Sequence, residues 1–231
     1  MDSPPEGGER QLILRVATRL YSALGYDNTS VEQIADAAGV DPADVNACFA
    51  SKQQLYLEVM EQVRELVTTA LRARTDELAA APPEGRGEAL HRFIDAYIDM
   101  CVAHPEIPAL WMHRWLSDAS DISEVEARDA QPLTRFIVNS VTRLAEPVRA
   151  DPLHLTYTMI WCVHGFVLSG VLDGRGIRIG IDDPAQLGRF RAHMHQLFGR
   201  ALGLPRSPAR SPGPHDRPHV PYACILPVWG V

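Results

Sequence analysis

The sequence predicts an all-α protein in which a small helical domain precedes a larger helical body. Apolar residues recur at spacings of three and four along almost the whole chain, which is the period of an amphipathic helix. The only candidate strand, residues 177–181 (IRIGI), is too short and isolated to form a sheet. The chain has 231 residues, of which 46% are hydrophobic and 22% charged, so it can bury a core and is not wholly disordered.

Proline and glycine divide the chain into segments. Residues 1–8 are predicted to be a flexible lead, 9–55 a small helical domain, and 56–204 the helical body. Within the body, 81–87 (APPEGRG) interrupts the helical pattern, and 173–184 is predicted to be a glycine-rich loop. Seven of the 18 prolines fall in residues 205–231, which predicts an unstructured or polyproline-like tail.

Charge and cysteine content exclude several classes of protein. The net charge of −7 leaves no broad basic surface for unspecific nucleic-acid binding. The cysteines at 48, 101, 162 and 224 form no close pair, which argues against a disulfide framework or a zinc ribbon and suits a reducing compartment. The first residues lack the apolar run of a secretory signal, so a cytoplasmic protein is expected.

Three short helices are predicted in residues 9–55. In the first, over 9–25, the residues Leu12, Val16, Leu20 and Ala23 share one face, and Gly25 is a stop signal. The second covers 30–38 and the third 42–48. Helices of this length, joined by the turn at 39–40, form a helix-turn-helix, a unit that places its second helix in the major groove of DNA.

Capping residues support these boundaries. Thr29 with Glu32 fits a capping box for the second helix, and Ser51 with Gln54 does so for the helix that starts at 52. Asp41 before Pro42 is typical of an N-cap followed by a proline at the first helical position. Gly39 permits the positive φ that a tight turn between helices requires.

The stretch from 12 to 59, with LYSALGYDNTSVEQIADAAGVDPADV followed by FASKQQLYLEV, resembles the N-terminal domain of the TetR family of bacterial transcriptional regulators. The matching positions are Leu20, Gly25 and Tyr26, then Thr29-Ser30-Val31, Ile34-Ala35, Ala38-Gly39-Val40, and finally Phe49, Ser51, Lys52 and Leu55. The resemblance implies a homodimer that binds a double-stranded DNA operator. It also implies a helical body whose small-molecule ligand alters operator affinity.

The predicted recognition helix departs from the family pattern. Asn46 stands where the family usually has a phosphate-binding tyrosine, and Asp44 replaces the preceding hydroxyl residue. Residues 1–55 carry four basic and eight acidic side chains, a net charge of −4, whereas DNA affinity depends on cationic phosphate contacts. Asp41 and Asp44 have two possible roles. They either cap their helix or place a carboxylate in the DNA groove, where it accepts a hydrogen bond from cytosine N4. The predicted DNA-binding residues are Thr29, Asp44, Asn46 and Lys52.

The body is predicted to contain helices over 52–78, 90–104, 105–116, 122–146, 153–172 and 184–202, with Pro132 kinking or splitting the fourth of these. Residues 153–172 are apolar on nearly every side and long enough to cross a membrane. Their histidines and hydroxyls favour a buried helix instead, so no membrane contact is expected. By the family resemblance, 153–172 and 184–202 pair with their copies in a second subunit to form the homodimer.

The body also offers candidates for an apolar or aromatic ligand pocket. For any single candidate a role in the core is favoured over a ligand contact, and Trp111 with Trp115, four apart on one helix face, is the pair singled out. His104, His113 or His164 would supply a polar contact. The candidate pool is Phe93, Tyr97, Met100, Trp111, Trp115, Met159, Trp161 and Phe166.

No catalytic, cofactor or metal-binding motif is recognised in the sequence, so no enzyme activity, cofactor or metal is predicted. The expected function is that of a TetR-like repressor released from its operator by a small hydrophobic ligand. The alternative is a dimeric ligand-binding or protein-interaction module whose DNA-binding domain has weakened.

Overall fold

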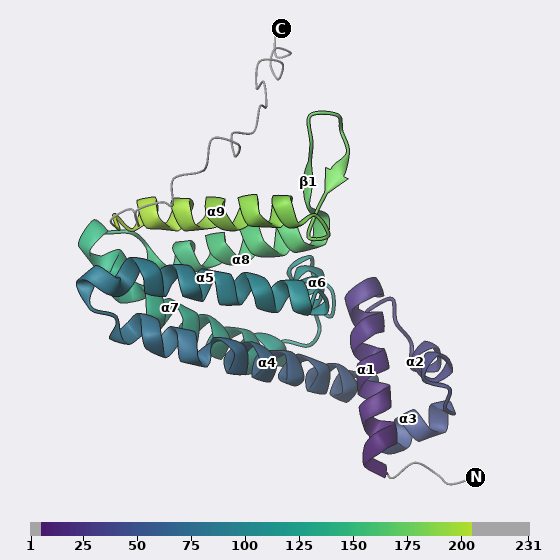
Figure 1. Cartoon of the computed structure of the whole chain (residues 1–231). Helices are drawn as coiled ribbons and strands as arrows, with labels where there is room; N and C mark the ends of the chain where they lie inside the picture. The colour runs from purple at the N-terminus through teal and green to yellow at the C-terminus, as the bar shows by residue number, and fades with distance from the viewer. Residues whose placement is uncertain (1–5, 205–231) are drawn as a thin grey trace, which may run out of the picture.

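The computed structural model describes residues 6–204, and within them the fold is helical, as predicted (Figure 1). The predicted tail at 205–231 and residues 1–5 of the predicted lead lie outside the described residues. The α-helices are α1 (Glu6–Leu24), α2 (Val31–Ala38), α3 (Pro42–Cys48), α4 (Lys52–Ala80), α5 (Arg86–Ala103), α6 (Glu106–Trp115), α7 (Gln131–Ala145), α8 (Pro152–Ser169) and α9 (Pro184–Ala201). Short 3-10 turns cover Pro83–Gly85 and Glu146–Val148.

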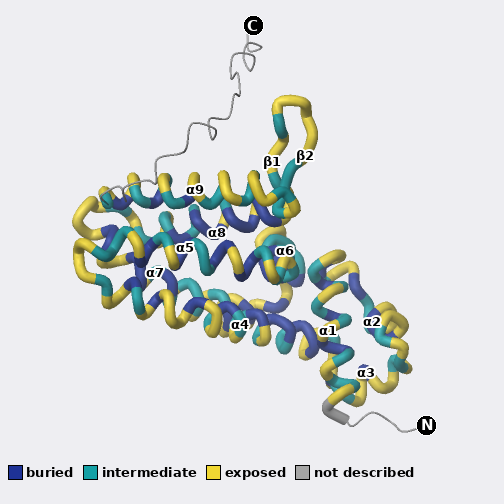
Figure 2. The backbone as a smooth tube through the Cα atoms, viewed as in Figure 1, coloured by how far each residue is buried: buried dark blue, intermediate teal, exposed yellow. Residues whose placement is uncertain are grey.

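Figure 1 shows α1, α2 and α3 gathered at one end of the molecule, and α4 running from them into the body. The body is built from α4, α5, α7, α8 and α9, which lie roughly alongside one another. The shorter α6 lies between this bundle and α1. Figure 2 shows that the buried side of α4 is continuous from the N-terminal helices into the body, because its apolar residues repeat at helical spacing.

Helix α1 differs from the prediction in its start and in its buried face. It begins at Glu6 because Gly7 and Gly8 lower helix stability by only about 1 kcal/mol each and do not block a helix as proline does. Its fully buried residues are Ile13, Leu14, Ala17 and Tyr21, whereas the predicted Ala23 is exposed. Leu12, Val16 and Leu20 flank that core and are partly buried. The apolar stripe is wide, and the sequence alone placed its centre one residue away.

The caps of the helix-turn-helix are largely as predicted, with one shift. The capping box of α2 uses Ser30 and Gln33 rather than Thr29 and Glu32. Gly39 ends α2 in the left-handed conformation, with φ of 70°. For α4, Ser51 accepts a hydrogen bond from the backbone of Gln54, whose side chain accepts from the backbone N–H of Ala50.

The segment predicted as one long helix over 122–146 is divided near Pro132. A π-helical turn, Glu126–Ala130, precedes α7, and Pro132 lies in the first turn of α7. Proline fits there because the first residues of a helix need no intrahelical N–H partner. The π turn buries the carboxylate of Asp129, which lies 3.2 Å from Arg64 on α4 and 3.2 Å from Arg128.

The loop predicted at 173–184 contains a small hairpin. Strands β1 (Val171–Leu172) and β2 (Arg178–Ile179) pair antiparallel and project beyond the ends of α8 and α9 (Figure 1). Asp173 shapes the turn by accepting hydrogen bonds from the backbone N–H groups of Arg175 and Ile177. Two pairs of residues are too few for an isolated two-stranded ribbon to be stable. For this reason the sequence pattern did not predict a sheet here.

The carboxylate of Asp118 links the N-terminal helices to the body. The backbone N–H groups of Tyr26 and Asp27, just after α1, donate to the two oxygens of Asp118 at 2.7 and 2.9 Å. Gly25 makes this approach possible, because its φ is +83° and a Cβ there would lie 2.9 Å from Asp118 Oδ1.

The loop that carries Asp118 is held by the buried side chain of Arg114. Its guanidinium donates to the carbonyls of Asp118, Ala119 and Ile122 and pairs with the carboxylate of Glu126. Arg114 lowers the pKa of the Glu126 carboxyl, so the pair stays charged at neutral pH. These bonds hold Ala119 at a positive φ of 53°, which non-glycine residues rarely adopt.

Replacing Gly25 by alanine should destabilise the protein more than replacing Gly39. Both positions have positive φ, a conformation that costs alanine about 1–2 kcal/mol. At Gly25 the new methyl group also displaces Asp118, which loses hydrogen bonds that contribute about 1 kcal/mol each. Urea unfolding of Gly25→Ala and Gly39→Ala measures the difference, and equal midpoints would show that the Asp118 contact does not matter.

Candidate functional site

The side chains of α3 that face away from the domain are small, and none of them is a cation. Ala43, Asp44, Asn46 and Ala47 are exposed, while Val45 is buried against the domain core. Phe49, directly after the helix, is buried as well. This division agrees with the sequence interpretation that Val45 and Phe49 pack and that Asn46 remains free to contact DNA.

The two aspartates of this helix act on its own backbone. Asp41 accepts from the N–H of Ala43 at 2.8 Å, and the Asp41 N–H donates to Asp44 Oδ2 at 3.1 Å. The arrangement is a capping box that satisfies two N–H groups at the helix start. It agrees with the interpretation of both residues as caps.

Thr29, predicted as a DNA contact, is 1% exposed. Its hydroxyl donates to the carbonyl of Gly25 at 2.7 Å, inside the turn between α1 and α2. In this structure the Thr29 side chain is therefore not exposed for the predicted DNA contact. Threonine before a helix is common both as an N-cap and as a buried turn residue, so the sequence does not distinguish the two. In this structure Ser30 is the N-cap of α2.

Two cations stand beside α3 rather than on it. Lys52, the only lysine in the chain, begins α4, with Nζ 4.0 Å from the centre of the Tyr26 ring. Arg10 lies over the Phe49 ring at 4.7 Å and pairs with Glu58. Both are cation–π contacts, which hold the cation in place on an aromatic face. Lys52 is the cation best placed to contact a phosphate next to α3.

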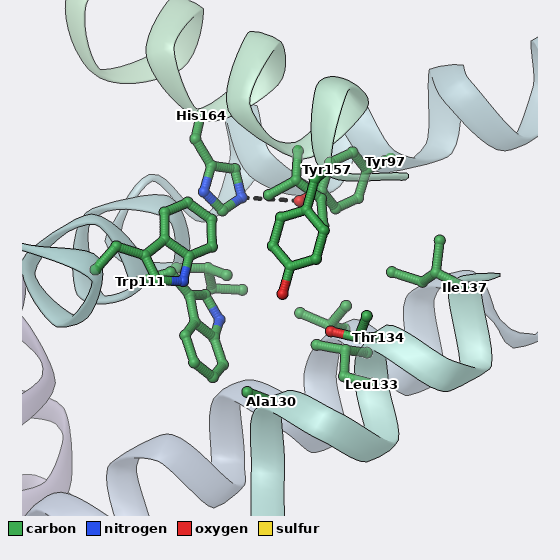
Figure 3. A pocket seen from close by; sticks show the side chains of 12 residues that line it. Tyr97, Trp111, Ala130, Leu133, Thr134, Ile137, Tyr157 and His164 are labelled. Atoms are coloured by element: carbon green, nitrogen blue, oxygen red, sulfur yellow. Dashed lines mark hydrogen bonds between the residues drawn. The ribbon is translucent and has the colours of Figure 1, made fainter. Parts of the chain in front are cut away.

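A second candidate site is a pocket in the body, between α4, α5, α6, α7, α8 and the π turn (Figure 3). Its cavity has a volume of about 50 Å³. Most of its wall is apolar or aromatic, and Figure 3 shows the Tyr157 hydroxyl directed into the space between His164 and Thr134. The lining residues are Val67, Tyr97, Ile107, Trp111, Trp115, Ala130, Leu133, Thr134, Ile137, Tyr157, Ile160 and His164.

Only part of the predicted ligand-binding pool lines this cavity. Tyr97, Trp111 and Trp115 do, and they come from α5 and α6. Other members of the pool belong to the core or to the outer surface. Phe93, Met100 and Met159 are buried in the core, Phe166 stacks on Phe190 of α9 at 4.0 Å, and Trp161 is 54% exposed on α8.

The sequence pattern did not predict that residues of α7 and the π turn line this cavity. Leu133, Thr134 and Ile137 share one face of α7, and on α8 the corresponding stripe is Tyr157, Ile160 and His164. Spacings of three and four mark such stripes. They do not distinguish the side of α8 that faces the pocket from the side that carries Trp161, because the helix is apolar all round.

His164 is the polar centre of the pocket. It is 2% exposed, its Nε2 lies 2.8 Å from the Tyr97 hydroxyl, and the Trp115 ring stacks on it at 5.4 Å. Burial lowers the pKa of His164 to about 4, so the imidazole is neutral at physiological pH.

Helix α6 contacts both the pocket and the N-terminal helices. Trp111 and Trp115 face the pocket, while His113 on the same helix lies with Nε2 3.2 Å from the carbonyl of Ser22 on α1. The loop after α6 holds Asp118, which binds the backbone after α1.

Comparison with known proteins decides the family. Residues 13–59 match the family model described as bacterial regulatory proteins, tetR family. The match covers α2, α3 and most of α1, with the first turns of α4. Residues 13–59 therefore form an N-terminal domain of the TetR family of regulators.

Similar sequences are themselves regulators. The HTH-type transcriptional regulator RutR of Escherichia coli is 24% identical over 156 residues, which are 66% of this chain and 70% of RutR. TcmR of Streptomyces glaucescens is 38% identical over 65 residues, which are 28% of this chain and 29% of TcmR.

Solved structures of regulators share the fold of most of the chain. AibR, in complex with isovaleryl coenzyme A and operator DNA, has a TM-score of 0.62 at 16% identity, covering 82% of this chain and 97% of AibR. The fatty acid degradation regulator FadR of Bacillus halodurans has a TM-score of 0.60 at 15% identity, with coverages of 88% and 97%. Among the described helices of the present protein, none is long and apolar enough to cross a membrane.

Acid should destabilise the regulator through His164. An unfolded histidine has a pKa of about 6.5, so the folded state binds this proton less strongly than the unfolded state does. Stability is therefore lost as the pH falls below 6.5, and the loss levels off below the folded pKa of about 4. At pH 4 it amounts to about 3 kcal/mol per chain.

Urea unfolding of the wild type and of His164→Asn, at pH 7.5 and at pH 4, measures this loss. The asparagine variant does not titrate at 164, so the stability of the wild type should fall further than that of the variant. Parallel pH profiles for the two proteins would contradict the burial of a neutral imidazole.

Proposed function

We propose that this regulator is a homodimeric repressor that acts in the cytoplasm and is released from its operator by a small apolar or aromatic ligand. In this proposal residues 9–55 bind DNA, and residues 56–204 bind the ligand and form the dimer. The observation that carries it is the double position of α6, which supplies Trp111 and Trp115 to the pocket and His113 to the contact with α1.

The size of the cavity supports a ligand-driven displacement of α6. Ligand pockets typically measure roughly 300–1,000 Å³, whereas this cavity measures about 50 Å³. A ligand must therefore push the walls apart. Trp115 is the wall residue best able to move, because it is 37% exposed and ends its helix.

The displacement would act on DNA binding by population shift. A ligand that binds better to the expanded pocket favours the conformer in which α6 and the Asp118 loop have moved. Each α3 then changes position with α1. Two recognition helices bind successive major grooves only when they lie about 34–36 Å apart, so a small displacement lowers operator affinity.

The known structures support this combination of sites on one fold. AibR has been solved with both isovaleryl coenzyme A and operator DNA, so that protein accommodates a small molecule and DNA. The pocket described here contains no cation for a phosphate-rich ligand, which favours a smaller and more apolar molecule for this regulator.

The dimer is proposed to form through α8 and α9. Leu153, Trp161 and Leu168 are exposed along the outer side of α8, an unusual amount of apolar surface for one helix. On α9 the exposed positions include Gly188 and Ala192, which allow close approach of another helix. An isologous two-fold pairing would bury both helices and hold two α3 helices at a fixed separation.

A second candidate function is a ligand-responsive interaction module with little affinity for DNA. The specific observation in its favour is the surface of α3, where the exposed residues are uncharged apart from Asp44. Phosphate contacts supply most unspecific DNA affinity, and this helix contributes none from a cation.

Fluorescence anisotropy with DNA from immediately upstream of the coding region separates the two functions. The repressor proposal expects selective binding that weakens steeply when salt is raised. Lys52→Ala should weaken binding uniformly and reduce the salt slope by about one, while Asn46→Ala should reduce the preference for the upstream fragment over random DNA.

The matched control is Arg74→Ala, which removes an exposed cation about six turns further along α4. It should leave both affinity and salt slope unchanged. If the wild type shows no preference over random duplex, on this fragment or on a genomic pool, the interaction-module proposal replaces the repressor.

Trp161→Glu should convert the dimer to monomer, because it places a charge at the centre of the proposed α8 interface. Leu116→Glu is the matched control, since Leu116 is 76% exposed on the loop after α6. Sedimentation equilibrium measures the masses. A dimer that survives Trp161→Glu would place the interface elsewhere.

A further inference from the structure

One buried nitrogen in the pocket lacks a partner. Within residues 6–204, His164 Nδ1 is buried and makes no hydrogen bond, although the other ring nitrogen bonds to Tyr97. Figure 3 shows the ring bonded to Tyr97 through one nitrogen, with the other turned away from that residue. An unpaired buried polar atom costs about 1–3 kcal/mol, so its presence at a cavity wall requires an explanation.

The hydrogen bond to Tyr97 determines which nitrogen of the ring carries the hydrogen. A phenol O–H is a stronger donor than an imidazole N–H, and an imidazole nitrogen is a stronger acceptor than a phenol oxygen. The Tyr97 O–H therefore donates to His164 Nε2. A neutral imidazole that accepts at Nε2 carries its hydrogen on Nδ1, so the orphaned atom is a donor.

The pocket also lacks any formal charge. Its lining contains no lysine, arginine, aspartate or glutamate, and the imidazole is neutral because burial lowers its pKa to about 4. A carboxylate or phosphate in this cavity would lose its hydration without gaining a cation. The polar groups of the lining are all neutral: the imidazole of His164, the hydroxyls of Tyr97, Tyr157 and Thr134, and the indole N–H groups of Trp111 and Trp115.

We propose that the pocket selects a neutral aromatic ligand with a hydrogen-bond acceptor, such as a ketone or ester carbonyl, and that this acceptor binds the Nδ1 hydrogen of His164. The inference rests on the proposed ligand-binding function and names the ligand class. The ligand reaches Nδ1 by shifting Trp115, whose indole stacks on the imidazole and is partly exposed. The same movement opens the cavity.

Three probes of nearly the same shape test the proposal: acetophenone, α-methylstyrene and benzoate. The first two differ only in a carbonyl group against a methylene group, and benzoate adds a charge. Calorimetric titration of the full-length wild type should give a dissociation constant for acetophenone about tenfold lower than for each of the others. An apolar cavity without a donor would instead prefer α-methylstyrene, because leaving water costs the carbonyl more.

A matched pair of variants assigns the preference to Nδ1. The amide of His164→Asn lies near the position of Nδ1, so this variant should retain the preference for acetophenone. The amide of His164→Gln lies near the position of Nε2, so that variant should lose the preference. In the wild type, nitrogen-edited NMR should show acetophenone shifting the Nδ1 resonance of His164 while Nε2 changes little, and this measurement does not depend on the folding of any variant.

The outcomes separate this inference from the proposed function. If α-methylstyrene binds as tightly as acetophenone or more tightly, the pocket binds apolar ligands but His164 is not their polar anchor, and the inference is overturned alone. Tightest binding of benzoate overturns the neutral ligand class. If none of the three probes binds, both the inference and the proposed pocket fail.

Discussion

The two hydrogen bonds that Asp118 accepts from Tyr26 and Asp27 set the position of the DNA-binding domain relative to the body. The hydrogen bonds from two backbone N–H groups to one carboxylate are strong and directional, whereas apolar packing alone would allow α1 to slide. Arg114 fixes the loop behind it through three backbone carbonyls. At the junction these directional polar contacts therefore supplement an apolar core that is continuous between the two parts.

A junction of this kind transmits movement because its parts belong to one short segment. Trp111, Arg114, Trp115 and Asp118 lie within eight residues, so the pocket wall, the clamp and the link to α1 cannot move independently. The opposite wall is anchored differently. Asp129, in the π turn, pairs with Arg64 at the middle of α4, which ties the π turn to α4 on that side of the cavity.

The sequence predicted the elements better than it predicted which side chains meet. Helix boundaries followed from caps and glycines such as Asp41 and Gly39, because these residues act on their own backbone. The pocket depended on tertiary packing. Trp111 and Trp115 were predictable as a pair on one face, but Phe93 and Trp161 have the same residue class and lie in the core and on the surface. Nothing local to Asp118 indicated a partner 92 residues earlier in the chain.

The absence of cations on α3 is consistent with a rigid junction between the DNA-binding domain and the body. With no cation on α3, one domain gains little from phosphates, so useful affinity requires two domains that bind at once. Such paired binding is lost when geometry forbids simultaneous contact. A strongly basic domain would hold DNA even at the wrong spacing. In the proposed repressor, weak individual contacts would make operator affinity depend on the spacing that α6 and Asp118 control.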